Sequence, residues 1–380
     1  MGVTAAKRWF AALLVSSMTL LSACGGSTTG STDGKEGSKA APTEPAADYA
    51  ELSPEQLAEK IKAEGAIVSY GMPDTWANYE EIWKTFTEKY GITHTDTDMS
   101  SAEELAKFEA EKDKPVADVG DVGITFGPTG KSRGILTAHK NKYWDEIPDW
   151  AKDPEGYWCS EYTGSISFIV NTKKVLNVPK SFADLLKPEY KGKVSIDDPL
   201  RSAQAKAGVL AAAFSRGGDE ANIQPGIDFF RELFQAGNYK PLEVNIANVQ
   251  KGEIAVGIIW DFNSLNWKDQ LNMDELTVVI PSDGSVTIPY VAVINKYAPH
   301  PYTAKAFNDF LFSDEAQIAY AKGFARPIRN VKLPDDVAKK LLPDSAYSAS
   351  KTIKDYAKWD ETASKVIPAL WEEQVLPEQK

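Results

Sequence analysis

The sequence contains very few cysteines, with only Cys24 and Cys159 among its 380 residues. With two cysteines, a fold stabilised by several disulfide bonds is excluded. Basic residues are also in the minority, because 42 Lys and Arg stand against 54 Asp and Glu, giving a net charge of −12. No stretch supplies the basic track that a nucleic-acid partner requires, so such a partner is excluded. Beyond residue 21, no apolar run approaches the roughly 20 residues of a membrane-spanning helix.

Neither zinc-binding nor catalytic residues have a recognisable arrangement. The three histidines, His94, His139 and His300, share no zinc spacing. Residues 130–134 (GKSRG) match the G-x-S-x-G pattern in letters, but the serine does not directly follow a predicted strand, as the nucleophile motif requires. Cys159 has no histidine nearby in sequence, so we expect it to be packed rather than reactive. The sequence therefore predicts no catalytic residue, no metal site and no cofactor.

One acidic segment begins like a calcium-binding loop. Residues 96–100 read Asp-Thr-Asp-Met-Ser, but Ser101 stands where the loop needs glycine and Lys107 where it needs the bidentate glutamate. The pattern favours a solvated loop over a calcium site.

The first 24 residues have the features of an export signal. Lys7 and Arg8 precede an apolar run over residues 9–21, and Leu-Ser-Ala-Cys follows at residues 21–24. This ending resembles the bacterial lipoprotein pattern, which implies removal of residues 1–23 and lipidation of Cys24. Residues 24–50 are rich in Gly, Ser, Thr, Ala and Pro and are expected to form a flexible linker. The mature protein would be exported and held by its lipid alone on the outer face of the cell membrane, or on the periplasmic face in a Gram-negative cell.

The remaining residues predict a two-lobed α/β protein. About 330 residues exceed the ~250–300 at which one hydrophobic core stops growing. Strand and helix periodicities alternate along the chain, as in a sheet covered by helices. A capping box at residues 53–56 predicts a helix to about Glu64, and a second box is predicted at residues 101–104. The other predicted elements are strands at 66–70, 117–126, 164–171, 193–196, 253–260, 277–281 and 287–295, and helices at 76–90, 203–216, 226–235, 302–312, 314–322 and three beyond Pro334.

Several motifs together resemble a known family. They are residues 119–123 (VGDVG), 162–171 (YTGSISFIVN), 192–199 (GKVSIDDP), 256–263 (VGIIWDFN), 298–307 (APHPYTAKAF), 313–317 (SDEAQ) and 323–329 (GFARPIR). The last two are the most specific. In this combination the chain, over about residues 64–329, resembles an extracellular solute-binding protein of a bacterial ABC importer. It is similar to the branch named for ferric iron, which also contains phosphonate and sugar-phosphate binders.

The resemblance implies a type II periplasmic-binding-protein-like fold with two crossing segments, near residues 162–167 and 286–290. Lobe 1 would comprise residues 51–163 and 287–330, lobe 2 residues 164–286, and residues 331–380 would form C-terminal helices packed on the lobes. The implied partners are an ABC permease with its ATPase and a small-molecule ligand held between the lobes. A monomer is expected. Open α/β sheets bind ligands beyond the carboxyl ends of their strands, so the loops that follow strands are the candidate sites.

Two of these loops lie in the first lobe. At residues 71–76, Asp74 or Thr75 is predicted to cap the next helix, and ligand contact is expected from Asp74, Thr75 or Trp76. Residues 127–132 lack the spacing of a phosphate loop. Thr129 and Lys131 there are candidates for holding a small anion, although an ordinary surface turn explains the segment equally well.

Two further loops lie in the second lobe. Ser202 is predicted to cap a helix while Arg201 offers a planar fork to a carboxylate or phosphate, unless it pairs with Asp197 or Asp198. Trp260, Asp261 and Asn263 follow a buried strand and are predicted at the cleft edge. The crossing segments carry Tyr162, Ser165 and Tyr290. These residues are expected either to contact the ligand or to form part of the hinge between the lobes.

Three ligand classes remain open. A phosphonate or sugar phosphate is the first choice, from the resemblance and the anion-binding loops. A polyamine is the second, because Trp76, Tyr79, Trp260, Asp74 and Asp261 could form an aromatic and acidic box. A ferric complex is the third, disfavoured because the paired tyrosines of the ferric-binding members are missing. The alternatives of another class are a sensor ectodomain partner and a surface lipoprotein hydrolase.

Overall fold

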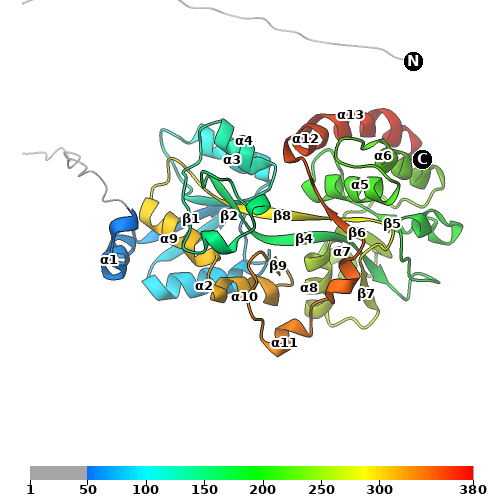
Figure 1. Ribbon diagram of the computed structural model, residues 1–380. Helices are drawn as coiled ribbons and strands as arrows, with labels where there is room; N and C mark the ends of the chain where they lie inside the picture. Colours follow the sequence, from blue (N-terminus) through cyan, green and yellow to red (C-terminus); the bar gives the residue numbers. More distant parts are fainter. Residues whose placement is uncertain (1–48, 380) are drawn as a thin grey trace, which may run out of the picture. The chain divides into compact units, whose positions relative to one another are not determined.

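The computed structural model describes residues 49–379. Two lobes lie side by side, and the long strands β4 (Trp158–Asn171) and β8 (Ser285–Ile294) run through both (Figure 1). The predicted signal segment, Cys24 and nearly all of the predicted linker lie outside the described residues.

The elements of the first lobe surround one end of the sheet. Its strands are β1 (Ala66–Tyr70), β2 (Thr93–Thr97) and β3 (Val119–Gly123). Its helices are α1 (Pro54–Glu64), α2 (Tyr79–Tyr90), α3 (Ser101–Ala110), α4 (Phe126–Ser132), α9 (Pro301–Leu311) and α10 (Asp314–Lys322).

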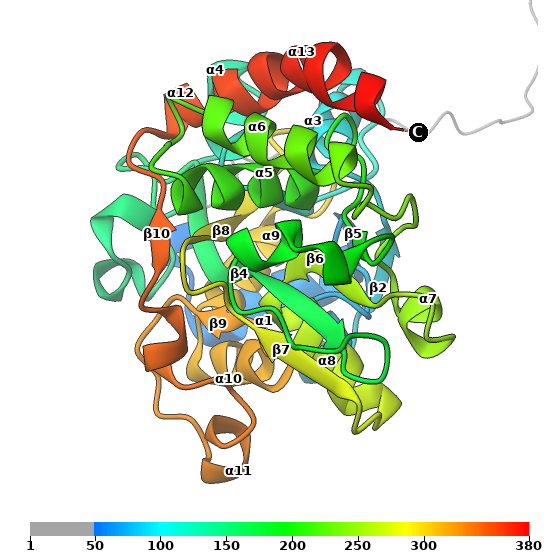
Figure 2. The same ribbon diagram turned by 90° about the vertical axis from the view of Figure 1, so that its right-hand side faces the viewer.

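The second lobe lies at the other end of β4 and β8. Its strands are β5 (Val194–Ser195), β6 (Val256–Trp260) and β7 (Leu276–Val279), and its helices are α5 (Ala203–Ser215), α6 (Gln224–Gln235), α7 (Ile246–Gln250) and α8 (Asp261–Leu271). The chain then adds β9 (Arg326–Pro327), α11 (Asp335–Ala338), β10 (Ser350–Thr352), α12 (Tyr356–Glu361) and α13 (Ile367–Leu370). Figure 2 shows α12 and α13 lying over α5 and α6.

Two antiparallel strands connect the lobes. The sheet order is β2-β1-β3-β8-β4-β6-β5, with β10 on β8 and both β7 and β9 on β4. Strands β4 and β8 pair from Trp158 opposite Val293 to Ser165 opposite Thr287, with a bulge between Ser160 and Tyr162. Because β4 pairs with β8 at one end and with β6 and β7 at the other, it belongs to both lobes. The predicted fold class is confirmed: the chain has a mixed α/β architecture with helices on both lobes.

Local sequence explains how several elements begin and end. Ser53 caps α1 in a reciprocal capping box with Gln56, as predicted, and Gly65 ends the helix with a φ of 75°. The second capping box was predicted one residue too late, because Ser100 and Glu103 form it. Strand β2 was not predicted, since its sequence Thr-His-Thr-Asp-Thr carries no apolar residue and it lies at the sheet edge.

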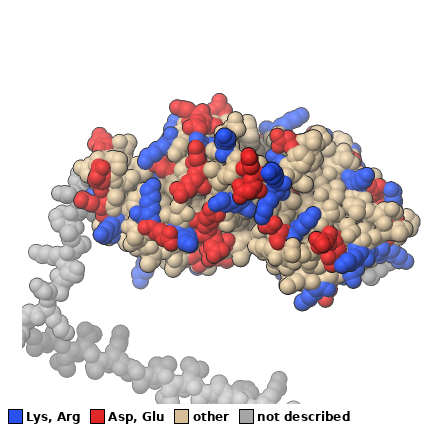
Figure 3. All heavy atoms as spheres, turned by 90° about the horizontal axis from the view of Figure 1, so that it is seen from below, with Lys and Arg blue, Asp and Glu red and all other residues tan. Residues whose placement is uncertain are grey.

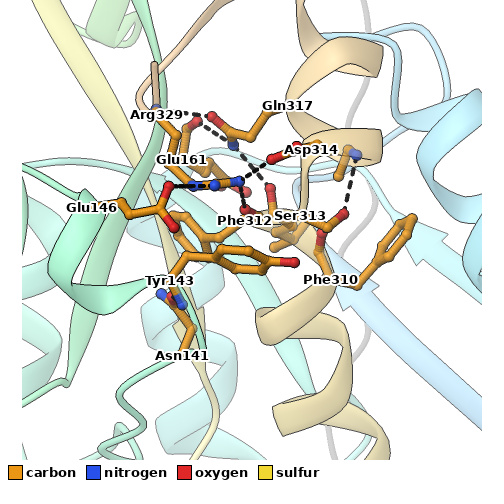
Figure 4. Close-up of polar contacts among 12 residues, drawn as sticks. Asn141, Tyr143, Glu146, Glu161, Phe310, Phe312, Ser313, Asp314, Gln317 and Arg329 are labelled. Carbon is orange, nitrogen blue, oxygen red and sulfur yellow. Dashed lines mark hydrogen bonds and ion pairs between the residues drawn. The ribbon is translucent and has the colours of Figure 1, made fainter. Parts of the chain in front are cut away.

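The family-specific stretch near the C-terminus of the first lobe anchors strand β4 (Figure 4). Gln317 donates from Nε2 to the carbonyl oxygens of Glu161 (3.0 Å) and Leu311 (2.9 Å). Its Oε1 accepts from the backbone N–H of Arg329 at 3.1 Å. The connecting strand is thereby tied to α10.

Arg329 is the most connected side chain of this cluster. Its guanidinium donates to the carbonyl oxygen of Phe312 (2.6 Å), to Asp314 (2.8 Å) and to Glu146 (3.0 Å from Nε). It also lies over the ring of Tyr143, 4.0 Å from the centroid. The residue is only 7% exposed. One planar cation therefore joins three segments of the first lobe.

The Arg329→Met variant is expected to lose about 2 kcal/mol of unfolding free energy, because a buried carbonyl and two carboxylates lose their donor. Denaturant unfolding monitored by tryptophan fluorescence measures this loss. Arg133→Met is the control, since Arg133 is half-exposed and makes only a 3.8 Å ion pair with Glu109. Equal effects of the two substitutions would contradict the anchoring role.

Candidate functional site between the lobes

A cleft between the lobes contains two adjoining hollows of about 210 and 280 Å³. Both are bordered by Ser100 and Ser101 from the first lobe, by Arg201 and Ala203 from the second, and by Tyr290 on β8. The smaller hollow also reaches Trp260, Lys206 and the C-terminal residues Trp359 and Asp360. The larger one reaches Gly71, Trp76, Asp98, Glu104, Asp121 and Gln204. The cleft therefore brings together residues from both lobes, one connecting strand and the C-terminal helices.

Two helix N-termini border this cleft. Ser100 caps α3, and Ser202 caps α5 through a 3.2 Å bond from the Ala205 N–H to its Oγ. The prediction that Ser202 caps a helix is confirmed. The first backbone N–H groups of a helix have no partner within it, and the helix dipole places partial positive charge there. The two ends suit an anionic group of a ligand.

Two cations of the second lobe lie beside these N-termini. The side chain of Arg201 is 90% exposed and its Nε lies 3.8 Å from the Asp198 carboxylate, which is a loose pairing. Lys206 lies one turn into α5, and partial burial lowers the pKa of its ammonium group. Lys206 was not predicted as a site residue. Its spacing could have identified it: Lys206 comes four residues after the predicted cap Ser202, so it lies on the same face of the helix, one turn further on.

The first-lobe side of the cleft is acidic. Asp98, Glu104 and Asp121 line it, and Glu104 and Asp121 are almost completely buried. The predicted solvated loop at residues 96–100 is confirmed only for residues 98–100, which lie outside any helix or strand, with Asp98 and Ser100 exposed. Asp96 is in β2 and accepts from Ser69 Oγ at 2.6 Å and from the Met72 N–H at 3.0 Å, while Met99 and Ser100 border the cleft. Sequence reasoning missed this side because β2 has no apolar pattern.

Five predicted site residues meet at the cleft: Trp76, Arg201, Ser202, Trp260 and Tyr290. Tyr162 is fully buried behind it, where its hydroxyl donates to Asp121 (2.6 Å) and accepts from Trp76 Nε1 (2.6 Å). Whether any of these side chains contacts a ligand stays a prediction.

Residues 74 and 75 do not have the predicted local role. Neither Asp74 nor Thr75 caps α2, because Asn78 occupies the N-cap with a φ of 64° and without a side-chain capping bond. Both residues are exposed and border neither hollow. The loop makes an additional turn, with positive φ at Ala77 and Asn78, before the helix begins.

Lys131 and Thr129 lie in α4 rather than in a loop. The Lys131 ammonium pairs with Asp153 at 2.8 Å and Glu155 at 2.7 Å, and these hydrogen bonds raise its pKa. The Thr129 hydroxyl donates to the carbonyl oxygen of Thr125 at 3.0 Å. Neither residue borders the cleft hollows.

The remaining predicted residues are buried structural partners. Asp261 accepts from the Ser165 N–H at 2.8 Å and from the Tyr347 hydroxyl at 2.6 Å, and the Ser165 hydroxyl lies 2.7 Å from that of Thr287. Asn263 is buried, and its Oδ1 has no hydrogen-bond partner among the described residues. Because Asp74 is exposed while Tyr79 and Asp261 are buried elsewhere, the proposed polyamine box is not assembled at the cleft.

Metal and cysteine chemistry find no support among residues 49–379. No group of three or more His, Cys, Asp or Glu side chains there is arranged to hold a metal ion. Cys159 is buried, as predicted, and burial raises the pKa of its thiol. Among the helices described, none combines the length and apolarity needed to cross a membrane.

Two lobes joined by a pair of strands, with a polar cleft between them, define a protein that binds a solute by enclosing it. Residues 114–357 match the family described as bacterial extracellular solute-binding protein, and the chain belongs to this family. The predicted family and its transport role in solute capture are thereby confirmed. Members of this family bind and deliver solutes rather than transform them.

The chain is also similar to individual proteins. An uncharacterized protein of Haemophilus influenzae is 31% identical over 260 residues, which cover 64% of this chain and 72% of the relative. A Salmonella typhimurium protein named "Putative 2-aminoethylphosphonate-binding periplasmic protein" is 25% identical over 301 residues, covering 75% of this chain and 83% of its own. Among solved structures, the periplasmic binding protein AfuA of Actinobacillus pleuropneumoniae, bound to fructose-6-phosphate, superimposes with a TM-score of 0.66. It is 25% identical, and the match covers 82% of this chain and 98% of that one.

Proposed function

We propose that this chain is the lipid-anchored binding component of an ABC importer and that it captures a small solute carrying a phosphonate or phosphate group. The solute is enclosed when the lobes close about β4 and β8, and it is then delivered to a permease driven by its ATPase. Neither a catalytic step nor a cofactor is part of this role, and the protein acts as a monomer. The anchor is the lipid on Cys24.

One observation carries the ligand proposal. The N-termini of α3 and α5, one from each lobe, border the same cleft, and Arg201 and Lys206 lie on the α5 side of it. A phosphonate or phosphate placed there accepts backbone N–H bonds from both lobes, so its binding favours the closed arrangement. The names of the Salmonella and Actinobacillus relatives, which mention a phosphonate and a sugar phosphate, support the same ligand class.

The net acidity of the protein does not oppose an anionic ligand. Lys and Arg atoms are interspersed with Asp and Glu atoms over the face drawn in Figure 3. Charges separated by more than the ~8 Å Debye length are largely screened at physiological ionic strength. The local groups of the cleft therefore decide what binds.

A thermal-shift panel tests the proposal on the full-length protein in detergent. Phosphonates, sugar phosphates, polyamines and ferric citrate are compared. A ligand present at ~100 times its dissociation constant adds about 2.7 kcal/mol of stability. Stabilisation by the phosphorus compounds supports the proposal, and stabilisation by ferric citrate alone or polyamines alone contradicts it.

The Arg201→Met variant should bind a stabilising phosphonate or phosphate about tenfold to one-hundredfold more weakly, because a charge-assisted bond of about 1.5–3 kcal/mol is lost. Isothermal titration calorimetry measures the change. Arg231→Met is the matched control, since Arg231 pairs with Asp228 on α6 and does not border the cleft. Unchanged affinity in Arg201→Met would remove Arg201 from the site.

A further inference from the structure

Two carboxyl groups of the cleft are buried without a cation partner among the described residues. Glu104 is 1% exposed and Asp121 is 3% exposed, and both line the larger hollow. Glu104 Oε2 and Asp121 Oδ1 have no hydrogen-bond partner among the described residues. Neither carboxyl forms an ion pair with any Lys, Arg or His of residues 49–379. Such groups are costly to bury and call for an explanation.

Two glycines leave room for the carboxyl group of Glu104. A Cβ at Gly71 would lie 2.3 Å from Glu104 Oε1, and a Cβ at Gly120 would lie 2.5 Å from Oε2. Any side chain at either position would displace the carboxyl group. The backbones of β3 and of the loop after β1 thus leave space for one carboxyl at the cleft wall.

The orientation of Asp121 is fixed by a chain of hydrogen bonds. Trp76 Nε1 donates to the Tyr162 hydroxyl, which donates to Asp121 Oδ2, both at 2.6 Å. The second oxygen, Oδ1, is left without a partner. The protein therefore holds Oδ2 of Asp121 firmly, while the carboxyl group also lies against that of Glu161, whose Oε1 likewise has no donor among the described residues.

Aromatic rings border the same hollow. Trp76 and Tyr290 both line it, with ring centroids 5.5 Å apart and ring planes inclined by 67°. Aromatic faces attract cations, and they add to the attraction of the two carboxyl groups. A hydrated inorganic cation is attracted mainly by the carboxyl groups, whereas an alkylammonium group is attracted by the carboxyl groups and by the aromatic rings.

We propose that Glu104 and Asp121, with Trp76 and Tyr290, form a subsite for an ammonium group of the ligand. Resting on the proposed function, this inference makes the ligand a zwitterion. Its phosphonate or phosphate faces the N-termini of α3 and α5, and its amine lies on the acidic wall of the first lobe. On binding, the ammonium keeps its proton, and a carboxyl that was protonated in the empty cleft releases its proton to solvent.

The titratable groups around the subsite are mainly acidic. Asp96 and Asp98 face Glu104, while Glu161, Tyr79 and Tyr162 face Asp121, and Tyr290 and the Arg201 guanidinium border the hollow. Burial raises the pKa of Asp121 to about 7 and that of Glu104 well above its usual range, and the other acidic groups add to the rise for Glu104. A bound ammonium reverses this effect because it supplies the missing positive charge.

Calorimetric titration of the full-length protein with three probes tests the subsite. The probes are 2-aminoethylphosphonate, ethylphosphonate and butane-1,4-diamine. Wild-type protein should bind the aminophosphonate about tenfold or more tighter than ethylphosphonate. The preference should grow between about pH 6 and pH 8 as the carboxyl groups ionise. Because the ammonium group also eases the second ionisation of the aminophosphonate, the carboxyl variants are titrated over the same pH range as the reference.

Matched variants assign the preference to the carboxyl groups. Glu104→Gln and Asp121→Asn should each bring the ratio of the two phosphonate affinities close to one. Glu88→Gln, which changes an exposed glutamate on α2, should leave the ratio intact. Melting curves confirm that each variant is folded.

The outcomes separate this inference from the proposed function. Equal affinity of wild-type protein for the two phosphonates would overturn the ammonium subsite while leaving the phosphonate site. Binding of the diamine without either phosphonate would keep the subsite and overturn the phosphonate proposal. A preference that survives both substitutions would remove Glu104 and Asp121 from the subsite, and absence of binding by all three probes would overturn both proposals.

Discussion

Replacing Asp121 by asparagine is expected to raise the free energy of unfolding by about 4 kcal/mol at about pH 8 and to leave it nearly unchanged at about pH 4. Burial raises the pKa of this carboxyl from 3.8 to about 7 in the folded protein. The folded state therefore binds the proton more tightly than the unfolded state does. Stability from this group is present at low pH and is lost as the pH rises through 7. Asparagine keeps the acceptor for Tyr162 and carries no charge at any pH.

Glu161 makes the expected effect larger. Burial raises the pKa of the Glu161 carboxyl first, and the charge of Asp121 raises it further. Removing the Asp121 charge thus also relieves its neighbour at high pH. Urea unfolding at several pH values measures the difference between the two proteins.

Asp113→Asn is the control for this experiment, because Asp113 is exposed in the turn after α3 and the variant should have the stability of wild type at each pH. Asp121→Asn combines a gain in stability with loss of the ammonium preference. Such an exchange is typical of residues kept for binding rather than for folding. Equal destabilisation by Asp121→Asn at low and high pH would contradict the raised pKa.

Replacing Trp371 by alanine is expected to lower the free energy of unfolding by about 4 kcal/mol, the largest loss predicted here. Trp371 is 2% exposed and lies in the π-helical turn Trp371–Val375. Its ring centroid lies 5.2 Å from that of Phe230 and 5.9 Å from that of Phe234, both on α6. The C-terminal helices are thereby fastened to the second lobe, and the alanine variant leaves a cavity at this contact.

Chemical denaturation of Trp371→Ala, measured in parallel with Trp150→Ala as the control, tests the prediction. Trp150 is 47% exposed, so Trp150→Ala should lower the free energy of unfolding much less than the same substitution at Trp371. Similar losses for the two tryptophans would show that the C-terminal helices contribute little to folding. A large difference would support residues 331–380 as part of the binding body, a boundary that stays a prediction.

Prediction from sequence succeeded where the determining interactions are local. The capping box of α1, the Ser202 cap of α5 and the succession of strands and helices follow from residues within a few positions of each other. The turn before α2 was missed because positive φ at Ala77 and Asn78 leaves no clear sequence signal. Polar β2 was missed because an edge strand needs no apolar face.

The candidate site was harder to predict because several charged groups form ion pairs or hydrogen bonds with residues that are distant in sequence. Lys131 is paired with Asp153, 22 residues away, and Asp261 with Tyr347, 86 residues away. Both were plausible ligand contacts when only their neighbours along the chain were considered. Glu104 was passed over for the opposite reason, since it stands in a helix among other charged residues.

The sequence by itself determined the family, the α/β class and the positions of most helices and strands, because these depend on periodicity and short motifs. Only the tertiary structure decided which polar side chains share the cleft. The physical reason is that burial and pairing depend on contacts across the whole fold. An aspartate carboxyl is an exposed surface group at Asp74, whereas at Asp121 it is buried without a cation partner among the described residues.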